Sequence, residues 1–154
     1  MDVVDRATRS RMMAAIRGKN TKAEVRLRKQ LFAQGFRYRL HRRDLPGSPD
    51  IVLPKYRAVI FVHGCFWHRH GCRFTTNPAT NSDFWSVKFS KNLVRDRLVR
   101  AELLAEGWRV ATVWECIIGT SGLSSRELTK LRKWLQETAT RRPEIQLPQK
   151  LPMI

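Results

Sequence analysis

Acidic residues are scarce in this chain of 154 residues, which has 13 aspartates and glutamates against 30 lysines and arginines. The formal net charge is therefore +17 at pH 7. Self-repulsion of that size disfavours a compact fold unless the charge meets a polyanion in use. Nucleic acid is the expected partner.

Long apolar runs and cysteine are scarce as well. No stretch approaches the length needed to cross a bilayer, and no signal-peptide pattern opens the sequence, so a cytoplasmic protein with no membrane partner is expected. The chain has only 3 cysteines. An odd number of cysteines in a reducing compartment is better explained by buried thiols or a metal site than by disulfides.

The hydrophobic patterns that are present alternate between helix and strand periods. "NTKAEVRLRKQLFAQG" predicts a helix that begins after Thr21 and ends at Gly35. "DIVL" and "RAVIFV" predict a hairpin whose second strand is buried on both faces. A polar stretch containing "NPATNSDFW" is then followed by a predicted helix, "KNLVRDRLVRAELLAEG", and by a predicted strand, "WRVATVWEC".

The two ends of the chain complete the predicted organisation. A short helix is expected over about residues 8–17, and a last helix is expected to start near Ser124. The proline-rich tail, about residues 142–154, is expected to be irregular. The order predicts a single α/β domain over residues 1–154, with a mixed central sheet covered by helices.

One segment, "FVHGCFWHRHGC", holds three of the four histidines and two of the three cysteines. Cys65, Cys72 and the distant Cys116 could supply three thiolates to a structural zinc, with one histidine completing a tetrahedral site. The spacing leaves open whether His68 or His70 is that fourth ligand. The alternative is that the cysteines are core thiols without a metal.

Two carboxylates are candidates for catalysis. Asp50 precedes the first hairpin strand and His63 ends the second, so the hairpin brings an acid and an imidazole to one end of the sheet. One carboxylate together with substrate phosphates can hold magnesium, although an aspartate here could also simply end a turn. Glu24 completes a capping box with Thr21, yet it also lies on the apolar stripe of its helix and is expected to face inward.

Six segments in this order resemble the very-short-patch repair (Vsr) DNA mismatch endonucleases: "DRATRSRMMAAI", "LPGSPDIV", "VIFVHGCFWHRHGC", "PATNSDFW", "KNLVRDR" and "GWRVATVWEC". The resemblance covers about residues 5–116. It implies a restriction-endonuclease-like fold with a structural zinc. It also implies a magnesium-dependent enzyme that nicks DNA on the 5′ side of the thymine in a T:G mismatch, which arises when 5-methylcytosine deaminates.

The resemblance also implies roles for individual residues. Zinc ligands are expected at Cys65, His70, Cys72 and Cys116, and His68 is the expected catalytic base. Asp50 is expected to bind magnesium, together with the backbone carbonyl of Val62, where a relative has threonine. Glu24 is expected to hold a metal-bound water, and His63 stands where related nucleases have a catalytic lysine.

The expected DNA contacts come from aromatic and basic residues near this site. By the resemblance, Met13, Phe66, Trp67 and Trp85 form a wedge pushed between base steps, and Lys88, Lys91 and Asn92 read the mismatch. Paired aromatics are otherwise more often core residues. His41, in the basic stretch "RYRLHRRD", is expected to contact phosphates.

Two functions from different classes are compatible with these residues. The first is a nicking enzyme that acts as a monomer on double-stranded DNA, with a cytosine methyltransferase and mismatch-repair proteins as further expected partners. The second is a zinc-stabilised module that binds mismatches without cutting. Magnesium and a T:G duplex discriminate them, because only the enzyme yields a nick.

Overall fold

The computed structural model of this chain describes residues 20–69, 72, 77–137 and 142–149. The expected helix over residues 8–17, including Met13, and the expected zinc ligand His70 lie outside these residues. Within the described ranges, no helix is both long enough and apolar enough to cross a membrane.

Helices and strands alternate along the chain, as the sequence predicts. Their order is α2 (Lys22–Ala33), β1 (Arg39–Leu40), β2 (Ile51–Leu53), a 3-10 turn (Pro54–Tyr56), β3 (Ala58–His63), α3 (Cys65–His68), α4 (Ser82–Ala105), β4 (Arg109–Trp114), α5 (Glu115–Ile118), α6 (Ser125–Gln136) and β5 (Glu144–Leu147).

The strands form one mixed sheet with the spatial order β1-β2-β3-β4-β5. The pairings of β1 with β2 and of β2 with β3 are antiparallel. The pairings of β3 with β4 and of β4 with β5 are parallel, and each of these connections contains helices. The predicted hairpin and the mixed α/β class are therefore confirmed.

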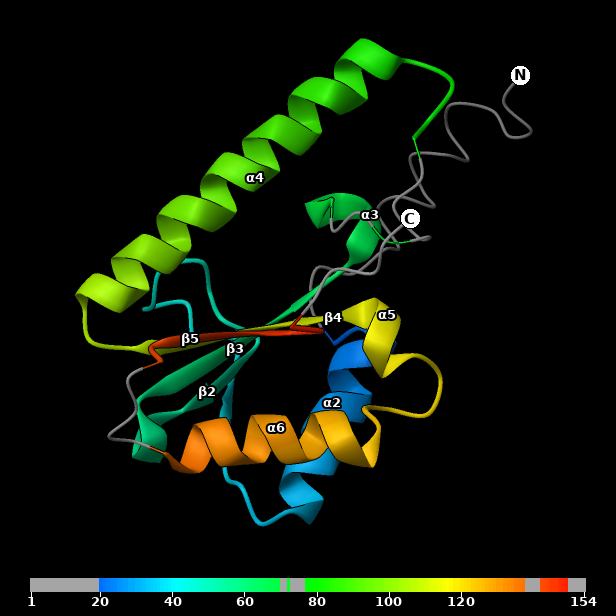
Figure 1. Cartoon of the computed structure of the whole chain (residues 1–154). Coiled ribbons are helices and arrows are strands. Elements are labelled where there is room, and N and C mark those ends of the chain that lie inside the picture. Colours follow the sequence, from blue (N-terminus) through cyan, green and yellow to red (C-terminus); the bar gives the residue numbers. More distant parts are fainter. Residues whose placement is uncertain (1–19, 70–71, 73–76, 138–141, 150–154) are drawn as a thin grey trace.

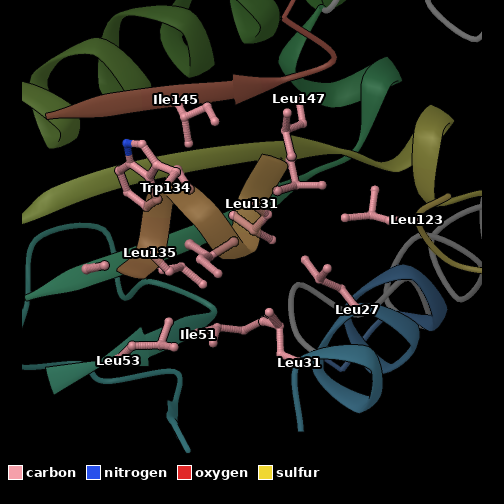
Figure 2. Packing of buried hydrophobic residues seen from close by; sticks show 14 of the residues in the cluster. Leu27, Leu31, Ile51, Leu53, Leu123, Leu131, Trp134, Leu135, Ile145 and Leu147 are labelled. Carbon is pink, nitrogen blue, oxygen red and sulfur yellow. The ribbon is translucent and has the colours of Figure 1, made fainter. Parts of the chain in front are cut away.

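Both faces of the sheet are covered, α4 lying on one face and α2 with α6 on the other (Figure 1). Side chains alternate between the faces along β3: Ala58 and Ile60 pack toward α2 and α6, whereas Val59 and Phe61 pack toward α4. On the α2 and α6 face, leucines from both helices meet the strands around Trp134 (Figure 2). This two-sided burial explains why the β3 sequence is apolar throughout.

Two expectations about the elements are wrong. The helix α4 begins at Ser82, inside the stretch expected to be a polar loop, so the "SDFW" aromatics lie on its first turn. The tail expected to be irregular contains β5, which pairs with β4 over Glu144–Leu147. The strand fits despite the flanking prolines because Ile145 and Leu147 alternate with polar residues and are buried under α6.

Candidate functional site

A cleft of about 1160 Å³ opens at the carboxyl ends of β3 and β4. Residues from α2, β3, α3, α4 and the β1–β2 connection line it, among them Glu24, Asp50, His63, His68, Trp67, Lys88 and Asn92. The structure thus brings together all four residues expected to be catalytic and several expected to contact DNA. Their individual roles remain predictions.

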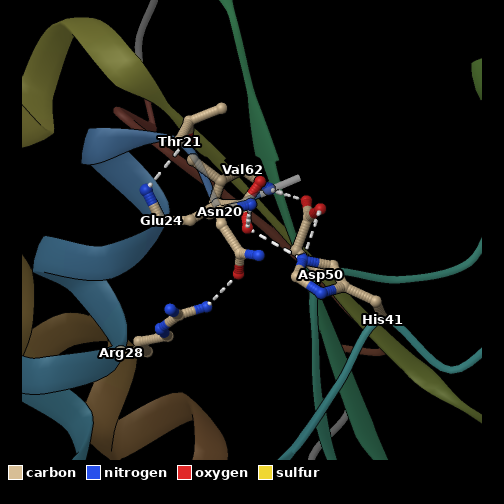
Figure 3. Close-up of polar contacts among 7 residues, drawn as sticks. All are labelled: Asn20, Thr21, Glu24, Arg28, His41, Asp50 and Val62. Atoms are coloured by element: carbon tan, nitrogen blue, oxygen red, sulfur yellow. Dashed lines mark hydrogen bonds and ion pairs between the residues drawn. The ribbon is translucent and has the colours of Figure 1, made fainter. Parts of the chain in front are cut away.

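The first polar group in the cleft joins Asp50 to the carboxyl end of β3 (Figure 3). The backbone N–H of Val62 donates to Asp50 Oδ2 at 2.8 Å, which is possible because β2 and β3 are antiparallel and Asp50 precedes β2. Burial, followed by the negative charge of Glu24, raises the pKa of Asp50 to about 8. Two carboxylates held this close favour a shared proton or a cation.

Glu24 faces inward as expected, since it is only 2% exposed. Its backbone N–H donates to Thr21 Oγ1 at 3.2 Å, and its Oε2 accepts from the Asn20 N–H at 3.0 Å. The predicted cap therefore exists, and it holds the carboxylate at the N-terminus of α2, where negative charge is favoured.

His41 occupies this same group rather than an outer surface. Its Nε2 lies 2.9 Å from Glu24 Oε2 and 4.0 Å from Asp50 Oδ1 (Figure 3). Its backbone φ of 46° turns the chain after β1 toward the cleft. The expectation that His41 belongs to a phosphate-contacting surface stays a prediction, because its side chain lines the cleft. Its contact with Glu24 was not expected, since the basic character of its neighbours gave no signal of it.

A second group contains both catalytic-histidine candidates. The rings of His63 and His68 are stacked with centroids 3.8 Å apart, and His68 Nδ1 lies 2.5 Å from Asp96 Oδ2. Burial, with a smaller effect from His68, lowers the pKa of His63 to about 3. His63 is therefore neutral at physiological pH.

Asp96 is a site residue that the sequence reasoning missed. Burial alone would raise the pKa of its carboxyl, but the hydrogen bond with His68 and nearby positive charge outweigh burial, so the pKa is lowered. The ionised Asp96 favours a proton on His68 Nδ1 and leaves Nε2 as a proton acceptor. Its spacing could have revealed it, because Asp96 lies one turn after Asn92 and two turns after Lys88 on α4.

The three cysteines form one group that includes Cys65, the first residue of α3. Their sulfur atoms lie within 4.8 Å of one another, although Cys116 comes from α5, far along the chain. Burial raises the pKa of the Cys65 and Cys116 thiols. Three sulfurs this close suit a tetrahedral thiolate site, in which zinc–sulfur bonds of about 2.3 Å separate the sulfurs by roughly 3.8 Å. The spacing of the three sulfur atoms is therefore compatible with a zinc site, in which the thiols would be deprotonated.

Aromatic side chains from α3 and α4 form a cluster at the rim of the cleft. Phe66 contacts Trp67, Trp85 and Phe89 edge-on at centroid separations of 5.1, 5.6 and 5.2 Å. Phe89 is buried, whereas the other three are half-buried. The cluster therefore combines a core anchor, which the sequence reasoning missed, with three rings that retain accessible surface.

Basic and amide groups on α4 border this cluster. Lys88 Nζ lies 5.6 Å from the centroid of the Trp67 ring, and Asn92 Nδ2 donates to the Trp67 carbonyl at 3.1 Å. Asn92 thus fixes α3 against α4 in addition to any contact with a base. Lys91 is exposed and does not line the cleft.

Comparisons with known proteins identify relatives over most of the chain. The family described as "DNA mismatch endonuclease Vsr" matches residues 1–74. A "DNA mismatch endonuclease Vsr" from Escherichia coli is 46% identical over 136 residues, covering 87% of each chain. A "Type II nicking enzyme V.XorIIP" from Xanthomonas oryzae pv. oryzae is 49% identical over 120 residues, which is 78% of this chain and 88% of the relative. A "Type II nicking enzyme V.NmeAIP" from Neisseria meningitidis is 42% identical, covering 88% and 97%.

Proposed function

The chain belongs to the DNA mismatch endonuclease Vsr family, and from this membership we propose that it nicks DNA on the 5′ side of the thymine in a T:G mismatch. Such a mismatch arises when 5-methylcytosine deaminates, so the nick would start very-short-patch repair. Membership of this family makes the protein a DNA endonuclease, which is a phosphodiester hydrolase.

The observation that carries this proposal is the cleft itself. The buried Glu24 and the half-buried Asp50 line the same cleft as a histidine paired with an ionised aspartate, and the half-buried aromatic cluster borders the same opening. Hydrolysis of a phosphodiester needs a base for water and positive charge near the phosphate. Both can be supplied here, while the aromatic rim can hold a distorted base step.

The catalytic base in this proposal is His68. Its Nε2 takes the proton of the attacking water, and Asp96 stabilises the resulting imidazolium through Nδ1. His63 stacks on His68 and stays neutral, so it fixes the ring plane without competing for the proton. Lys88 and Arg95 line the cleft and can neutralise phosphate charge.

Asp50 and the Val62 carbonyl would hold magnesium, and Glu24, which lies in one group with Asp50, would hold the ion directly and not only through a bound water. When bound, magnesium neutralises charge on the scissile phosphate and assists the ionisation of water. The raised pKa of Asp50 fits this assignment, because two close carboxylates without a cation retain a proton. The amide N–H of Val62 fixes Asp50 Oδ2, so the valine side chain does not enter this contact. Zinc, held by Cys65, Cys72, Cys116 and by His70, would have a structural role.

The test compares T:G duplex with the matched duplex in the presence and absence of magnesium. We expect a single nick in the thymine strand of the T:G duplex only when magnesium is present. A shifted band without any nick, at saturating protein and with several divalent ions, would favour the binding module instead. Varying the bases around the mismatch would then define the sequence context.

A further inference from the structure

His41 lines the cleft, and the proposed mechanism does not use it. It lies in the connection after β1, and its side chain is 17% exposed, so it is directed inward although its neighbours Arg42 and Arg43 are basic. Its imidazole is the third member of a group that also contains Glu24 and Asp50, whose candidate ligand atoms all lie within 4.8 Å of one another.

The separations within this group fit three ligands of one cation. His41 Nε2 lies 2.9 Å from Glu24 Oε2 and 4.0 Å from Asp50 Oδ1. Two donor atoms bound to one ion at about 2.1 Å cannot be more than about 4.2 Å apart, and they are about 3.0 Å apart when the bonds are perpendicular. Both separations lie below the maximum of about 4.2 Å, and the ligand atoms of Glu24 and Asp50 lie within 4.8 Å of each other.

We propose that His41 Nε2 is a third protein ligand of the divalent cation held by Glu24 and Asp50, and that it gives this site a preference for Mn²⁺ or Co²⁺ over Mg²⁺. The inference rests on the proposed function, because it concerns the same metal site. Ligation needs the lone pair of Nε2, so in the metal-bound form the neutral imidazole carries its one proton on Nδ1, and any proton between Nε2 and Glu24 is released to solvent.

The preference follows from ligand chemistry. Magnesium favours oxygen ligands in octahedral geometry and retains several waters, whereas first-row transition metals accept imidazole nitrogen and bind N/O sites in the order Mn²⁺ < Co²⁺. Magnesium still binds through the two carboxylates at high concentration. The imidazole therefore adds affinity selectively for the transition metals.

The alternative interpretation of the contact between His41 and Glu24 is that His41 only positions Glu24. As a neighbour of the metal ligands it would hydrogen-bond Glu24 in every state, and its loss would weaken all divalent cations alike. Ligation, in contrast, puts a histidine nitrogen on the ion and separates the effects on Mn²⁺ and Mg²⁺. The two interpretations predict different nitrogen modulation of the bound Mn²⁺ and different changes in the ratio of Mn²⁺ affinity to Mg²⁺ affinity.

The experiment uses the full zinc-loaded chain with one equivalent of Mn²⁺ and follows electron spin-echo modulation. We expect ¹⁴N modulation of the Mn²⁺ signal, which changes to the ¹⁵N pattern when only the histidines are ¹⁵N-labelled. Because this measurement is made on the wild-type protein, it does not depend on whether a variant folds. Bound Mn²⁺ without histidine modulation overturns the proposal.

Two variants identify the histidine. His41→Gln, which offers an oxygen donor of similar reach, should abolish the modulation, while His68→Ala, in the other group of the cleft, should retain it. The Mn²⁺-over-Mg²⁺ affinity ratio should fall roughly tenfold or more in His41→Gln and stay unchanged in His68→Ala. Equal losses of Mn²⁺ and Mg²⁺ affinity in His41→Gln would make His41 a positioning residue and overturn ligation.

The nicking assay separates the two proposals. If Mn²⁺ shows histidine modulation but no T:G duplex is cut with any cation, the ligation by His41 stands and the proposed function fails. If the wild-type chain nicks T:G duplex with Mg²⁺ but its Mn²⁺ shows no histidine nitrogen, the function stands and the ligation fails.

Discussion

The hydrogen bond between His68 and Asp96 joins the short helix α3 to the middle of α4. A catalytic histidine needs one defined tautomer, and a carboxylate on Nδ1 supplies it while stabilising the protonated ring. Because the hydrogen bond with His68 and nearby positive charge lower the pKa of Asp96 in spite of its partial burial, it remains ionised over the range in which His68 would work.

We expect Asp96→Asn to lower the nicking rate on T:G duplex by about 10²-fold to 10⁴-fold, because the amide can stabilise the wrong tautomer and carries no charge. Affinity for the duplex should change little, since Asp96 does not supply positive charge. Single-turnover rates and binding isotherms measure the two effects. A variant that nicks at the wild-type rate would remove Asp96 from the mechanism.

The carboxylate pair of Glu24 and Asp50 has a consequence for stability. Folding raises the pKa of Asp50 from an ordinary value near 4 to about 8, so the folded chain binds this proton more tightly than the unfolded chain. The contribution to the free energy of unfolding is therefore fully present below pH 4. It is lost as the pH rises through about 8.

In buffer without magnesium, Asp50→Asn should weaken this pH dependence, because asparagine does not ionise and can still accept the Val62 N–H. At pH 8 to 9 the variant should be more stable than wild type, by on the order of a few kcal/mol, and in a separate assay with magnesium it should not nick T:G duplex. Denaturant titrations at several pH values measure this. Parallel pH profiles for the two proteins would mean that Asp50 is ionised in the folded chain at neutral pH.

At the scale of elements, α3 is a four-residue helix that cannot hold its shape alone. It is held by the bond from Asn92 on α4, by Glu115 Oε1 accepting from the Cys65 N–H at 3.0 Å, and by the cysteine group. These contacts surround the segment that carries Trp67 and His68. Zinc would join α3 to α5 across the carboxyl ends of β3 and β4.

We expect one zinc per chain after purification, and removal of it by a strong chelator should lower thermal stability and abolish nicking together. Cys116→Ser should bind less zinc and reproduce both losses, because it removes the ligand on α5. Elemental analysis and thermal unfolding measure these effects, with magnesium restored before activity is assayed. A fully active protein that contains no zinc would contradict the expectation.

The sequence predicts elements best where a local signal coincides with burial. The α2 cap at Thr21 and the apolar β3 were readable because hydrogen bonding and burial act on neighbouring residues. The β5 strand was missed, because its stability comes from Ile145 and Leu147 packing under α6 and not from local propensity. His41 was missed for the same reason, since its partners Glu24 and Asp50 are 17 and 9 residues away in the sequence and meet it only in the folded chain.

At the scale of the whole molecule, two kinds of DNA affinity should be separable. The net charge of +17 acts on phosphates irrespective of sequence. The aromatic cluster acts at one base step, where unstacking costs about a few kcal/mol and less at a wobble pair than at a Watson–Crick pair. Salt weakens the first contribution, whereas removal of an aromatic ring weakens the second.

Trp67→Ala tests this separation, with Phe32→Ala as the control because Phe32 is an exposed aromatic residue, 54% accessible, on α2. We expect Trp67→Ala to reduce nicking of T:G duplex by about 10-fold to 100-fold, since loss of one stacked ring costs about 1–3 kcal/mol. Binding of matched duplex should be nearly unchanged, and so should both properties of Phe32→Ala. Far-UV and near-UV circular dichroism show whether each variant is folded.

Raising the salt concentration should have the opposite effect to the Trp67→Ala change, because salt weakens the phosphate contacts and leaves the stacking contribution in place. Raising salt from about 50 to about 200 mM should weaken matched-duplex binding by about 10³-fold or more if six or more phosphates are contacted, and the slope should be the same in wild type and Trp67→Ala. The ratio of T:G affinity to matched-duplex affinity should stay nearly constant with salt in wild type, because the phosphate contribution is common to both duplexes and cancels in the ratio. In Trp67→Ala that ratio should be lower at every salt concentration. Proportional loss of matched and mismatched binding in this folded variant would show that Trp67 supports the cleft without sensing the mismatch, and recognition would then lie with Lys88 and Asn92.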